Sequence, residues 1–493
     1  KPYKSYTDEK EDIIRFLNGY IMLNSTISLN GGIIRNELFR FNAPIYFSLE
    51  KNEHLAIVGE NGSGKTILVK TILGECPLKE GTITYNFPSS DAIEYLSFYD
   101  AYGNAGSGYY YQQRWNSWDR ENIPTVSDEL NKIKSNSDIK EELYDSLDIS
   151  PLLNKEIILL SSGELRKFQI VKKLLFSPAV LIIENPYIGL DEKARKILDT
   201  LLNRLTIRSK IQIILVLPSS EYIPPFITHV YTVQNKICGK KQSLNEFKDS
   251  ESPLPPFTPK EIVFPAFHAA PPIEGEQIAD LHNVTVRYKE KTILNRFNWY
   301  IRKGEKWALT GPNGSGKSTL LSLICADNPQ SYACDITLFG RKRGTGESIW
   351  DIKKHIGYIS SEMHHAYKKN ITALQLTASG FFDSIGLYRT PDEIQLRTCE
   401  EWLRIFNLET LKDRPFLQLS SGEQRMFLLA RAFVKNPDLL ILDEPLNGLD
   451  RKNRERATHI IQSFAGQPDK TLIYVTHYPQ DLPACITHTM HLG

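Results

Sequence analysis

The 493-residue sequence has no run of about 18 consecutive apolar residues, the length that an α-helix needs to cross a bilayer. It also has almost no net charge, because 59 basic residues are balanced by 58 acidic ones to leave +1. The first absence argues against a membrane-spanning segment, and the second removes any bulk attraction to nucleic acid or an anionic membrane. If the protein serves a transporter, we therefore expect the membrane pore to be another chain.

Cysteine is scarce, and none of the six residues forms a C-x-x-C pair. This scatter favours free, packed thiols in a reducing compartment over a disulfide or metal framework. We expect a cytoplasmic protein that is at most peripheral at the inner face of the cell membrane. The six residues are Cys76, Cys238, Cys325, Cys334, Cys399 and Cys485.

One glycine-rich stretch fits the pattern G-x4-G-K-[ST], the phosphate-binding loop of nucleoside triphosphatases. Apolar residues 307–310 before it read as a buried strand, and residues 320–324 after it read as a helix. Such a loop points its backbone N–H groups into one concavity at a helix N-terminus, where polyphosphate binds. Lys317 would reach the β- and γ-phosphates, and Ser318 would hold Mg²⁺. The stretch is Gly311-Pro312-Asn313-Gly314-Ser315-Gly316-Lys317-Ser318-Thr319.

The same pattern occurs a second time, 252 residues upstream (317 − 65), which argues against a chance match. We therefore interpret the chain as a tandem repeat of one nucleotide-binding unit. The upstream copy is Gly59-Glu60-Asn61-Gly62-Ser63-Gly64-Lys65-Thr66.

Composition divides the chain into four parts. Residues 1–24 form a short extension with a charged, one-sided helical pattern, which fits packing on the first domain or docking to a partner. Residues 25–250 and 277–493 alternate apolar strands with helical segments, which predicts two α/β domains with mainly parallel sheets. Residues 251–276 are proline-rich and predict a semi-rigid linker without a helix.

Further motifs follow each loop in a fixed order. In the second unit, Leu419-Ser420-Ser421-Gly422-Glu423 precedes the apolar strand 439–442, which ends in Asp443 and Glu444. Asp450 follows, and a strand over 472–476 then leads to His477. Together with the phosphate loops, these elements resemble the ATP-binding-cassette (ABC) ATPases.

The resemblance implies two ABC-type nucleotide-binding domains in a head-to-tail pseudo-dimer. Each would have a mainly parallel sheet core, an antiparallel β-subdomain and a helical subdomain. Ser161 and Gly163 would complete the second phosphate loop, and Ser420 and Gly422 the first. The resemblance also implies ATP and Mg²⁺ as ligands, and a role for Asp191 and Asp450 in the segments after the strand-end carboxylates.

Phosphoryl transfer to water needs charge neutralisation and an oriented nucleophile more than covalent chemistry. Asp443 would hold Mg²⁺ with Ser318, and Glu444 would orient and polarise the attacking water. His477 would bond the γ-phosphate, although a satisfied histidine at a strand end is the alternative. Tyr288, 29 residues before Lys317 (317 − 288), stands where the family stacks an aromatic ring on adenine, although a merely packed tyrosine fits too.

The two units differ at the residues that would activate water. The serine-glycine segment lies 23 residues before the strand-end carboxylate in both units (184 − 161 and 443 − 420). In this register Glu184 corresponds to Asp443, Asn185 to Glu444 and Pro218 to His477. An amide is a poor base and proline cannot bond phosphate. We expect the first site, with Lys65, Thr66 and Glu184, to bind nucleotide but turn over poorly.

Both units also depart from the family where it places a glutamine that contacts Mg²⁺ and a membrane partner. Here the corresponding residues are Ser361 and Phe98, which puts ordinary coupling to a transporter in doubt. The tract 335–358, with 382–386 and 484–488, resembles the ModF-like family of molybdenum-transport ATP-binding and photorepair proteins.

Two classes of function follow. The first is the ATP-binding component of an ABC transporter, with an integral membrane permease in a separate chain. The second is a soluble ATP-driven switch that acts on nucleic acid or the ribosome. Arg341-Lys342-Arg343 would serve the second class, although a solvated loop explains it as well. The aromatic segment 109–115 fits a cover over the sheet, a docking surface for a partner or, with little local charge, a platform for stacked bases.

Overall fold

The computed structural model describes most residues of the chain. These are residues 25–87, 93–97, 124–133, 137–160, 162–190, 192–208, 211–250, 257–259, 261–267, 270–271, 273, 275–288, 291–312, 314–360, 363–364, 367 and 370–492. The predictions for the N-terminal extension, the aromatic segment 109–115, Phe98, Ser161, Asp191, Asn313 and Ser361 fall outside them.

The first unit is built on a sheet whose central strands are parallel and buried. Its strand order is β10-β8-β3-β7-β6-β5, with β9 paired to β8 and only the β9 and β10 pairings antiparallel. Every residue of β3, β6 and β7 is buried, which is typical of parallel strands covered on both faces. The strands are β3 (Leu55–Val58), β5 (Ile93–Leu96), β6 (Val180–Glu184), β7 (Gln212–Leu217), β8 (His229–Gln234), β9 (Ile237–Cys238) and β10 (Gln242–Ser243).

A separate antiparallel sheet, in the order β2-β1-β4, covers one side of the first unit. Its strands are β1 (Ser25–Ile34), β2 (Ile45–Glu50) and β4 (Leu78–Tyr85). The helices are α2 (Lys65–Ile72), α3 (Val126–Asn131), α4 (Ser137–Ser146), α5 (Ser162–Leu174), α6 (Glu192–Arg208) and α7 (Leu244–Ser250), with short 3₁₀ turns η1 (Glu37–Phe39), η5 (Ser150–Leu152) and η6 (Ile157–Leu159).

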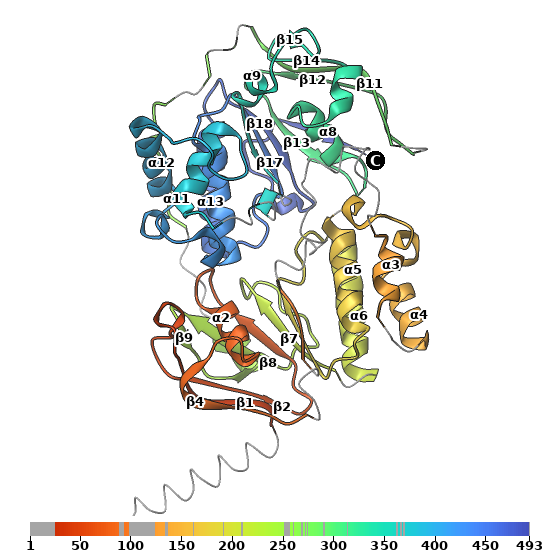
Figure 1. Ribbon diagram of the computed structural model, residues 1–493, viewed down its shortest axis with the longest axis vertical. Coiled ribbons are helices and arrows are strands. Elements are labelled where there is room, and N and C mark those ends of the chain that lie inside the picture. Colours follow the sequence, from red (N-terminus) through yellow and green to blue (C-terminus); the bar gives the residue numbers. More distant parts are fainter. Residues whose placement is uncertain are drawn as a thin grey trace, which may run out of the picture.

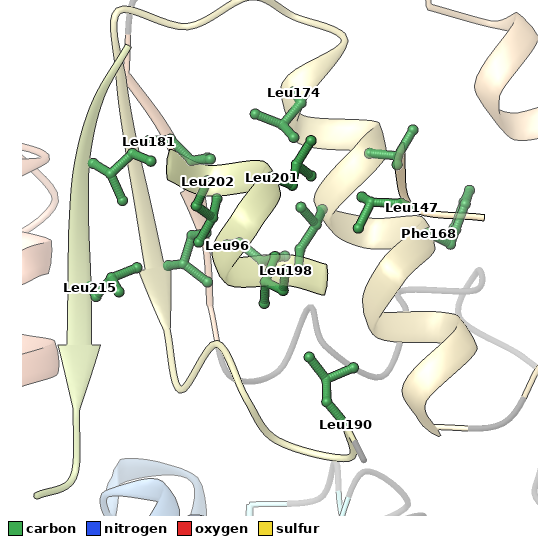
Figure 2. Close-up of a cluster of buried hydrophobic side chains, with 14 of the residues drawn as sticks. Leu96, Leu147, Phe168, Leu174, Leu181, Leu190, Leu198, Leu201, Leu202 and Leu215 are labelled. Atoms are coloured by element: carbon green, nitrogen blue, oxygen red, sulfur yellow. The ribbon is translucent and has the colours of Figure 1, made fainter. Parts of the chain in front are cut away.

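The apolar core of the first unit lies where helices α5 and α6 pack on the parallel sheet. Figure 2 shows Phe168 and Leu174 from α5 and Leu198, Leu201 and Leu202 from α6 around the strand residues Leu96, Leu181 and Leu215. Burial of these side chains is the main source of stability for such a layered domain. Packing of α5 and α6 therefore fixes the sheet, and predicted site residues follow the carboxyl ends of its strands.

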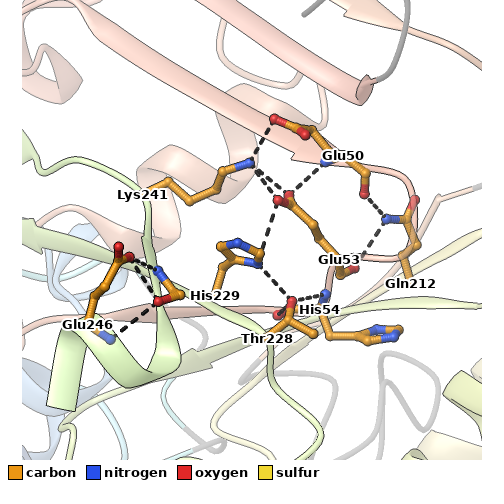
Figure 3. Close-up of polar contacts among 9 residues, drawn as sticks. Glu50, Glu53, His54, Gln212, Thr228, His229, Lys241 and Glu246 are labelled. Atoms are coloured by element: carbon orange, nitrogen blue, oxygen red, sulfur yellow. Dashed lines mark hydrogen bonds and ion pairs between the residues drawn. The ribbon is translucent and has the colours of Figure 1, made fainter.

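A polar network closes the opposite edge of the first unit. The ammonium of Lys241 lies 2.9 and 2.8 Å from the two carboxylate oxygens of Glu53, and Gln212 Nε2 donates to the backbone oxygen of Glu50 at 2.6 Å (Figure 3). His229 Nδ1 lies 3.5 Å from Glu53 Oε1. Glu53 is buried, so these partners offset the cost of removing its charge from water. The network connects the turn between β2 and β3 to the first residues of β7 and β8, the two strands that flank β3.

The second unit repeats this plan. Its parallel sheet has the order β16-β17-β18-β13-β19, and its antiparallel sheet has the order β12-β11-β14-β15. The strands are β11 (Gln277–Tyr288), β12 (Lys291–Arg302), β13 (Lys306–Thr310), β14 (Asp335–Leu338), β15 (Arg341–Lys342), β16 (Ile356–Ile359), β17 (Leu439–Asp443), β18 (Thr471–Val475) and β19 (His488–His491). The helices are α8 (Lys317–Ile324), α9 (Ile349–Lys353), α11 (Ala373–Ala378), α12 (Glu393–Ile405), α13 (Ser421–Phe433) and α14 (Arg451–Ala465), with 3₁₀ turns η7 (Pro329–Ala333), η8 (Ser379–Phe382), η9 (Glu409–Leu411), η10 (Phe416–Gln418) and η11 (Pro479–Asp481).

The two units are arranged head to tail. In Figure 1 the first unit lies below in red to yellow-green, with α3, α4 and α5 on its right, whereas the second unit lies above in green to blue, with α11, α12 and α13 on its left. The two helical subdomains are thus on opposite sides of the molecule. The predicted fold class is confirmed: two α/β domains each combine a mainly parallel core, an antiparallel β-subdomain and a helical subdomain.

The proline-rich linker packs against the second unit. Residues 257–259 and 261–267 form neither helix nor strand. The ring of Phe264 lies 5.5 Å from that of Trp402 and 5.6 Å from that of Phe464, and Phe267 lies 5.1 Å from Phe381, measured between ring centroids. These distances are typical of packed aromatic pairs. The linker is therefore part of the second unit's surface as well as a connection.

Candidate functional site

The second phosphate loop connects β13 to α8 and places a lysine against its own backbone. The N-cap of α8 is Gly316, in the left-handed conformation at φ 100°, which glycine adopts without strain. Lys317 is buried, and its ammonium donates to the carbonyls of Gly311 at 2.7 Å and Pro312 at 2.9 Å. Gly314 and Thr319 belong to the same turn and helix. The result is a positively charged loop at a helix N-terminus.

The first phosphate loop has the same geometry. Its N-cap glycine, Gly64, has φ 109°, and Lys65 donates to Gly59 O at 2.6 Å and Glu60 O at 2.8 Å. Burial lowers the pKa of Lys65 to about 8, against the opposing effect of nearby carboxylates, first among them Glu184. A bound polyphosphate would replace part of the charge stabilisation that water supplies to an exposed lysine.

Each loop also contains a buried hydroxyl without a protein partner. Ser63 Oγ and Ser315 Oγ have no hydrogen-bond partner among the described residues. Buried polar atoms are normally paired, and unpaired ones often mark the place of an ion, water or ligand. Together with the two buried lysines and the glycine turns, these hydroxyls fit a phosphate group in each loop.

The strand-end carboxylate of the first unit lies beside the hydroxyl of the loop. Thr66 Oγ1 donates to Glu184 Oε1 at 2.5 Å, and Tyr95 donates from its hydroxyl to Glu184 Oε2 at 2.8 Å. In the second unit, Ser318 is in the first turn of α8 and Asp443 ends β17, at the equivalent positions. No group of three or more His, Cys, Asp or Glu side chains in the described parts of the chain could hold a metal alone. A hydroxyl and one carboxylate suit Mg²⁺, which usually keeps water and phosphate oxygens as its other ligands.

The second unit joins Glu444 and His477 at the ends of adjacent strands β17 and β18. The backbone N–H of His477 donates to Glu444 Oε1 at 2.8 Å, and His477 Nε2 lies 3.7 Å from the same oxygen. Burial, followed by the neighbouring Asp443 carboxylate, raises the pKa of Glu444 to about 8. A carboxylate with a pKa near neutrality is suited to accept a proton from water.

The first unit has Asn185 and Pro218 at the positions that correspond to Glu444 and His477. Asn185 follows Glu184 and takes the same left-handed backbone conformation as Glu444, with φ 49° and 50° respectively. Its backbone N–H donates to Val216 O, as that of Glu444 donates to Val475 O, both at 2.9 Å. The two units are therefore alike in backbone and differ in side-chain chemistry.

Two buried arginines, Arg166 and Arg425, bind these strand ends, and neither belongs to the motifs identified in the sequence. Arg166 Nη2 donates to the carbonyls of Glu184 at 2.6 Å and Asn185 at 3.1 Å. Arg425 Nη2 donates to the carbonyls of Asp443, at 2.9 Å, and Glu444. Each arginine lies five residues after the first serine of its serine-glycine segment (166 − 161 and 425 − 420), so their repeated spacing was a usable signal.

The first phosphate loop faces the serine-glycine segment of the second unit. The backbone N–H of Asn61 donates to Asp450 Oδ2 at 2.7 Å, and its side-chain amide donates to Gly448 O at 3.3 Å. A Cβ built on Gly422 would lie 1.7 Å from Asn61 Nδ2, so only glycine permits this approach. Ser420 caps α13 beside it through the backbone N–H of Glu423.

A second region between the units borders the second phosphate loop. A cavity of about 580 Å³ is lined by residues from the start of α6 in the first unit and from the loop and strand ends of the second. Gly163 lies in α5 of the first unit. The lining residues include Glu192, Lys193, Lys196, Gly311, Thr476 and His477.

Tyr288 is the last residue of β11, and its hydroxyl has a polar partner while its ring packs against apolar residues. Its hydroxyl accepts from Asn328 Nδ2 at 2.9 Å, and its ring packs at the edge of the core that contains α8. The structure thus places the ring beside the helix of the second phosphate loop. Whether it stacks on adenine stays a prediction.

Comparison with known proteins identifies the family. The ABC transporter family description matches residues 43–187 and 294–447. The ABC transporter ATP-binding protein ModF of Escherichia coli is 36% identical over 464 residues, which cover 90% of this chain and 92% of ModF. An uncharacterized ABC transporter ATP-binding protein of Schizosaccharomyces pombe is 32% identical, over 91% of this chain and 94% of that protein.

One solved structure shares the fold of both units at low sequence identity. It is the complex of the archaeal ribosomal stalk protein aP1 with the ribosome recycling factor aABCE1, with TM-score 0.51 and 19% identity over 94% of this chain and 87% of that chain. None of the helices in the described residues is both long and apolar enough to cross a membrane.

The chain therefore belongs to the ABC transporter family of ATP-binding proteins, with two cassettes in one polypeptide. Like other members, it is a P-loop ATPase, and the predicted resemblance is confirmed.

Proposed function

We propose that this protein binds Mg²⁺–ATP at two composite sites between its units and hydrolyses ATP at one of them. The hydrolytic site consists of the second phosphate loop, Asp443, Glu444 and His477, completed by Ser161 and Gly163 of the first unit. The observation that carries this proposal is the contact between Glu444 and His477, for which the first unit has only Asn185 and Pro218.

Each side chain of the second site has a definable role. Lys317 would stabilise negative charge on the β- and γ-phosphates, and Ser318 and Asp443 would hold Mg²⁺. The ion, when bound, neutralises phosphate charge. Glu444 would orient water and accept its proton, and His477 would bond the γ-phosphate and help to fix that water.

The residues of the first site fit nucleotide binding without efficient ATP hydrolysis. Lys65, Thr66 and Glu184 provide the same kinds of phosphate and metal ligands, and Ser420, Gly422 and Asp450 of the second unit close the site. The amide of Asn185 is a poor base. Nucleotide in this site would therefore hold the two units together for longer than one catalytic cycle.

Steady-state ATPase assays on matched variants of the two units test this asymmetry. Lys317→Ala and Glu444→Gln should each lower kcat by about a hundredfold or more, the range expected for loss of charge stabilisation or of a general base. Lys65→Ala should keep substantial turnover at saturating ATP. Equal losses in Lys65→Ala and Lys317→Ala would contradict the proposal, as would an active Glu444→Gln protein.

For the biological role, we infer the ATP-binding component of an ABC transporter whose permease is a separate chain. The relative from Escherichia coli is named an ABC transporter ATP-binding protein, and it matches this chain over nearly its whole length. The alternative is an ATP-driven switch factor that acts on nucleic acid or the ribosome. Ser361 and Phe98 favour the alternative, because they replace the glutamine expected to sense a membrane partner.

Affinity capture with the Glu444→Gln variant in the presence of ATP separates the two roles, because slow hydrolysis prolongs the ATP-bound state. Recovery of an integral membrane protein would support the transporter role. Recovery of ribosomes or nucleic acid would support the switch factor. Lys317→Ala is the matched control. Because this variant should not form the ATP-bound state at the second site, it should not capture a partner that binds through that state.

A further inference from the structure

Tyr478, the residue after His477, crosses from the second unit into the first. It is 9% exposed, and its hydroxyl donates to the backbone oxygen of Leu190, at the end of the described stretch before Asp191. Arg195 Nη2 in turn donates to the Tyr478 hydroxyl at 2.9 Å, and the guanidinium lies 5.0 Å from the ring centroid. One tyrosine therefore makes three contacts across the boundary between the units.

Arg195 is itself held firmly on helix α6. Its guanidinium lies 5.1 Å from the ring centroid of Tyr187 and 5.7 Å from that of Tyr222, within range of cation–π attraction. The hydroxyls of both tyrosines donate to Asp199, that of Tyr187 at 2.6 Å. The three rings and the carboxylate fix the direction in which Arg195 reaches across the interface.

On the other side, Tyr478 is connected to the proposed base. Its backbone N–H donates to Thr476 Oγ1 at 3.1 Å, and Thr476 Oγ1 lies 3.5 Å from Glu444 Oε2. His477, between them, donates its backbone N–H to Glu444 Oε1 at 2.8 Å. Residues 476–478 thus form a short rigid segment that contacts the carboxylate at one end and the first unit at the other.

We propose that Tyr478 is a positioning residue for hydrolysis, and that its hydroxyl fixes Glu444 and His477 relative to the first unit. This inference rests on the proposed function of the second site. Closure of the two units would then be needed for catalysis as well as for nucleotide binding, because the geometry of the base depends on a group from the opposite unit.

This contact exists at the second site alone in the described residues. Pro218 corresponds to His477, so Ser219 corresponds to Tyr478, and its hydroxyl lies 3.5 Å from Glu221 of its own unit. The cavity beside the second loop is bordered by α6 through Glu192 and Lys196 and by the segment that contains Thr476. Tyr478 connects these two sides of the cavity, because it follows His477 and contacts Arg195 of α6.

Steady-state ATPase kinetics on Tyr478→Phe test the proposal, because this variant keeps the ring and removes only the hydroxyl. We expect kcat to fall about tenfold, because the variant loses the hydrogen bonds of the hydroxyl to Leu190 and Arg195, while KM for ATP stays within about twofold. Arg195→Met should lower kcat similarly, and the double variant should lose little more than either single one. The melting temperatures of the variants should remain close to that of the wild type.

Glu221→Gln is the matched control. Glu221 forms a cross-unit ion pair with Arg454 at 3.1 Å, so its loss weakens the same interface without touching Tyr478. Its kcat should equal that of the wild type. If Glu221→Gln lowers kcat as much as Tyr478→Phe does, the proposal is overturned. Any weakening of the interface would then explain the loss of activity.

Glu444→Gln, assayed in parallel, separates failure of the inference from failure of the proposed function. If Glu444→Gln is inactive and Tyr478→Phe has the wild-type kcat, the positioning role is overturned and the site assignment stands. An increase in KM at unchanged kcat for Tyr478→Phe would also overturn the positioning role, because such a change would indicate that Tyr478 acts in ATP binding. If Glu444→Gln is active, the proposed function itself fails.

Discussion

Glu444 occupies a backbone conformation that its side chain disfavours. At φ 50° it lies in the left-handed region, which non-glycine residues adopt at a cost of roughly 1 kcal/mol and asparagine tolerates best. The first unit places Asn185 at the same point. The second unit thus carries local strain together with a buried carboxylate, a combination that proteins tend to hold at functional sites.

Comparison of Glu444→Asn with Glu444→Gln measures this strain. Both amides should abolish most ATPase activity, because neither can act as a base. The asparagine variant should be more stable by about 0.5–1 kcal/mol, because it fits the left-handed conformation. Urea unfolding followed by tryptophan fluorescence gives the two free energies. A less stable asparagine variant would show that the backbone is not strained here.

His364 makes the second unit sensitive to acid. It is buried and lies 2.6 Å, through Nε2, from Gln424 Oε1, and burial lowers its pKa to about 3. Because an unfolded histidine titrates near pH 6.5, the unfolded state binds a proton that the folded state refuses as pH falls from 6.5 toward 3. Folding stability should therefore fall in this window and be unaffected above it.

The effect is measured as a difference between proteins. Between pH 7.5 and 5.5, the wild type should lose about 1 kcal/mol more unfolding free energy than His364→Gln, in which this titration is absent. Urea unfolding at the two pH values gives this difference. Identical pH dependence in the two proteins would exclude His364 as the cause, since all other titrating groups are shared.

Motif spacing and the resemblance to the ABC ATPases predicted the candidate residues of the site, but not the contacts that hold these residues in place. Lysines and glycines of the loops are recognisable because phosphate binding restricts both residue type and spacing. Arg425 and Tyr478 contact backbone carbonyls from elsewhere in the fold, and such contacts leave little trace in a local pattern. Arg425 could have been found by its repeat in the first unit, whereas Tyr478 could not, because Ser219 stands at the matching position.

At the scale of elements, the parallel strands were the most predictable. Strands β17 and β18 lie close to the apolar runs 439–442 and 472–476 that predicted them, because strands buried on both faces need continuous hydrophobic sequence. Strand β1, in contrast, pairs irregularly with β2 between Leu29 and Gly32. A bulge depends on the partner strands, so it is difficult to recognise in one segment.

The position of the linker also could not be predicted from its sequence. Proline content correctly indicated a segment without a helix in its described residues, but it could not indicate where the chain would lie. Docking depends on Phe264 meeting Trp402 and Phe464, which come from two helices distant in sequence. Such contacts exist only once the helical subdomain has folded.

Replacing Phe264 by alanine tests whether docking stabilises the second unit. The side chain is half-buried between two aromatic rings, so its loss should cost about 2 kcal/mol. Val263→Ala is the matched control, because Val263 is 85% exposed and should change stability by less than about 0.5 kcal/mol. Calorimetric unfolding measures both. Equal stabilities of the two variants would mean that the linker only rests on the surface.

At the scale of the whole molecule, the two units share one design but differ at the interface. Among the described residues, Tyr478 of the second unit contacts Leu190 of the first unit, whereas Ser219, at the matching position, contacts Glu221 of its own unit. The resemblance to the ABC ATPases implied that the two units would face each other. The unequal contacts followed from neither repeat, because they depend on which residues diverged on each side.

The linker that fastens the two units also determines how the enzyme responds to dilution. Each half meets the other at an effective concentration on the order of millimolar, set by the tether rather than by the amount of protein present. ATP turnover per molecule should thus be constant over a wide range of protein concentrations, and become concentration-dependent after the chain is cleaved within residues 251–276. In this arrangement the two cassettes meet within one polypeptide, and their pairing needs no encounter between separate chains.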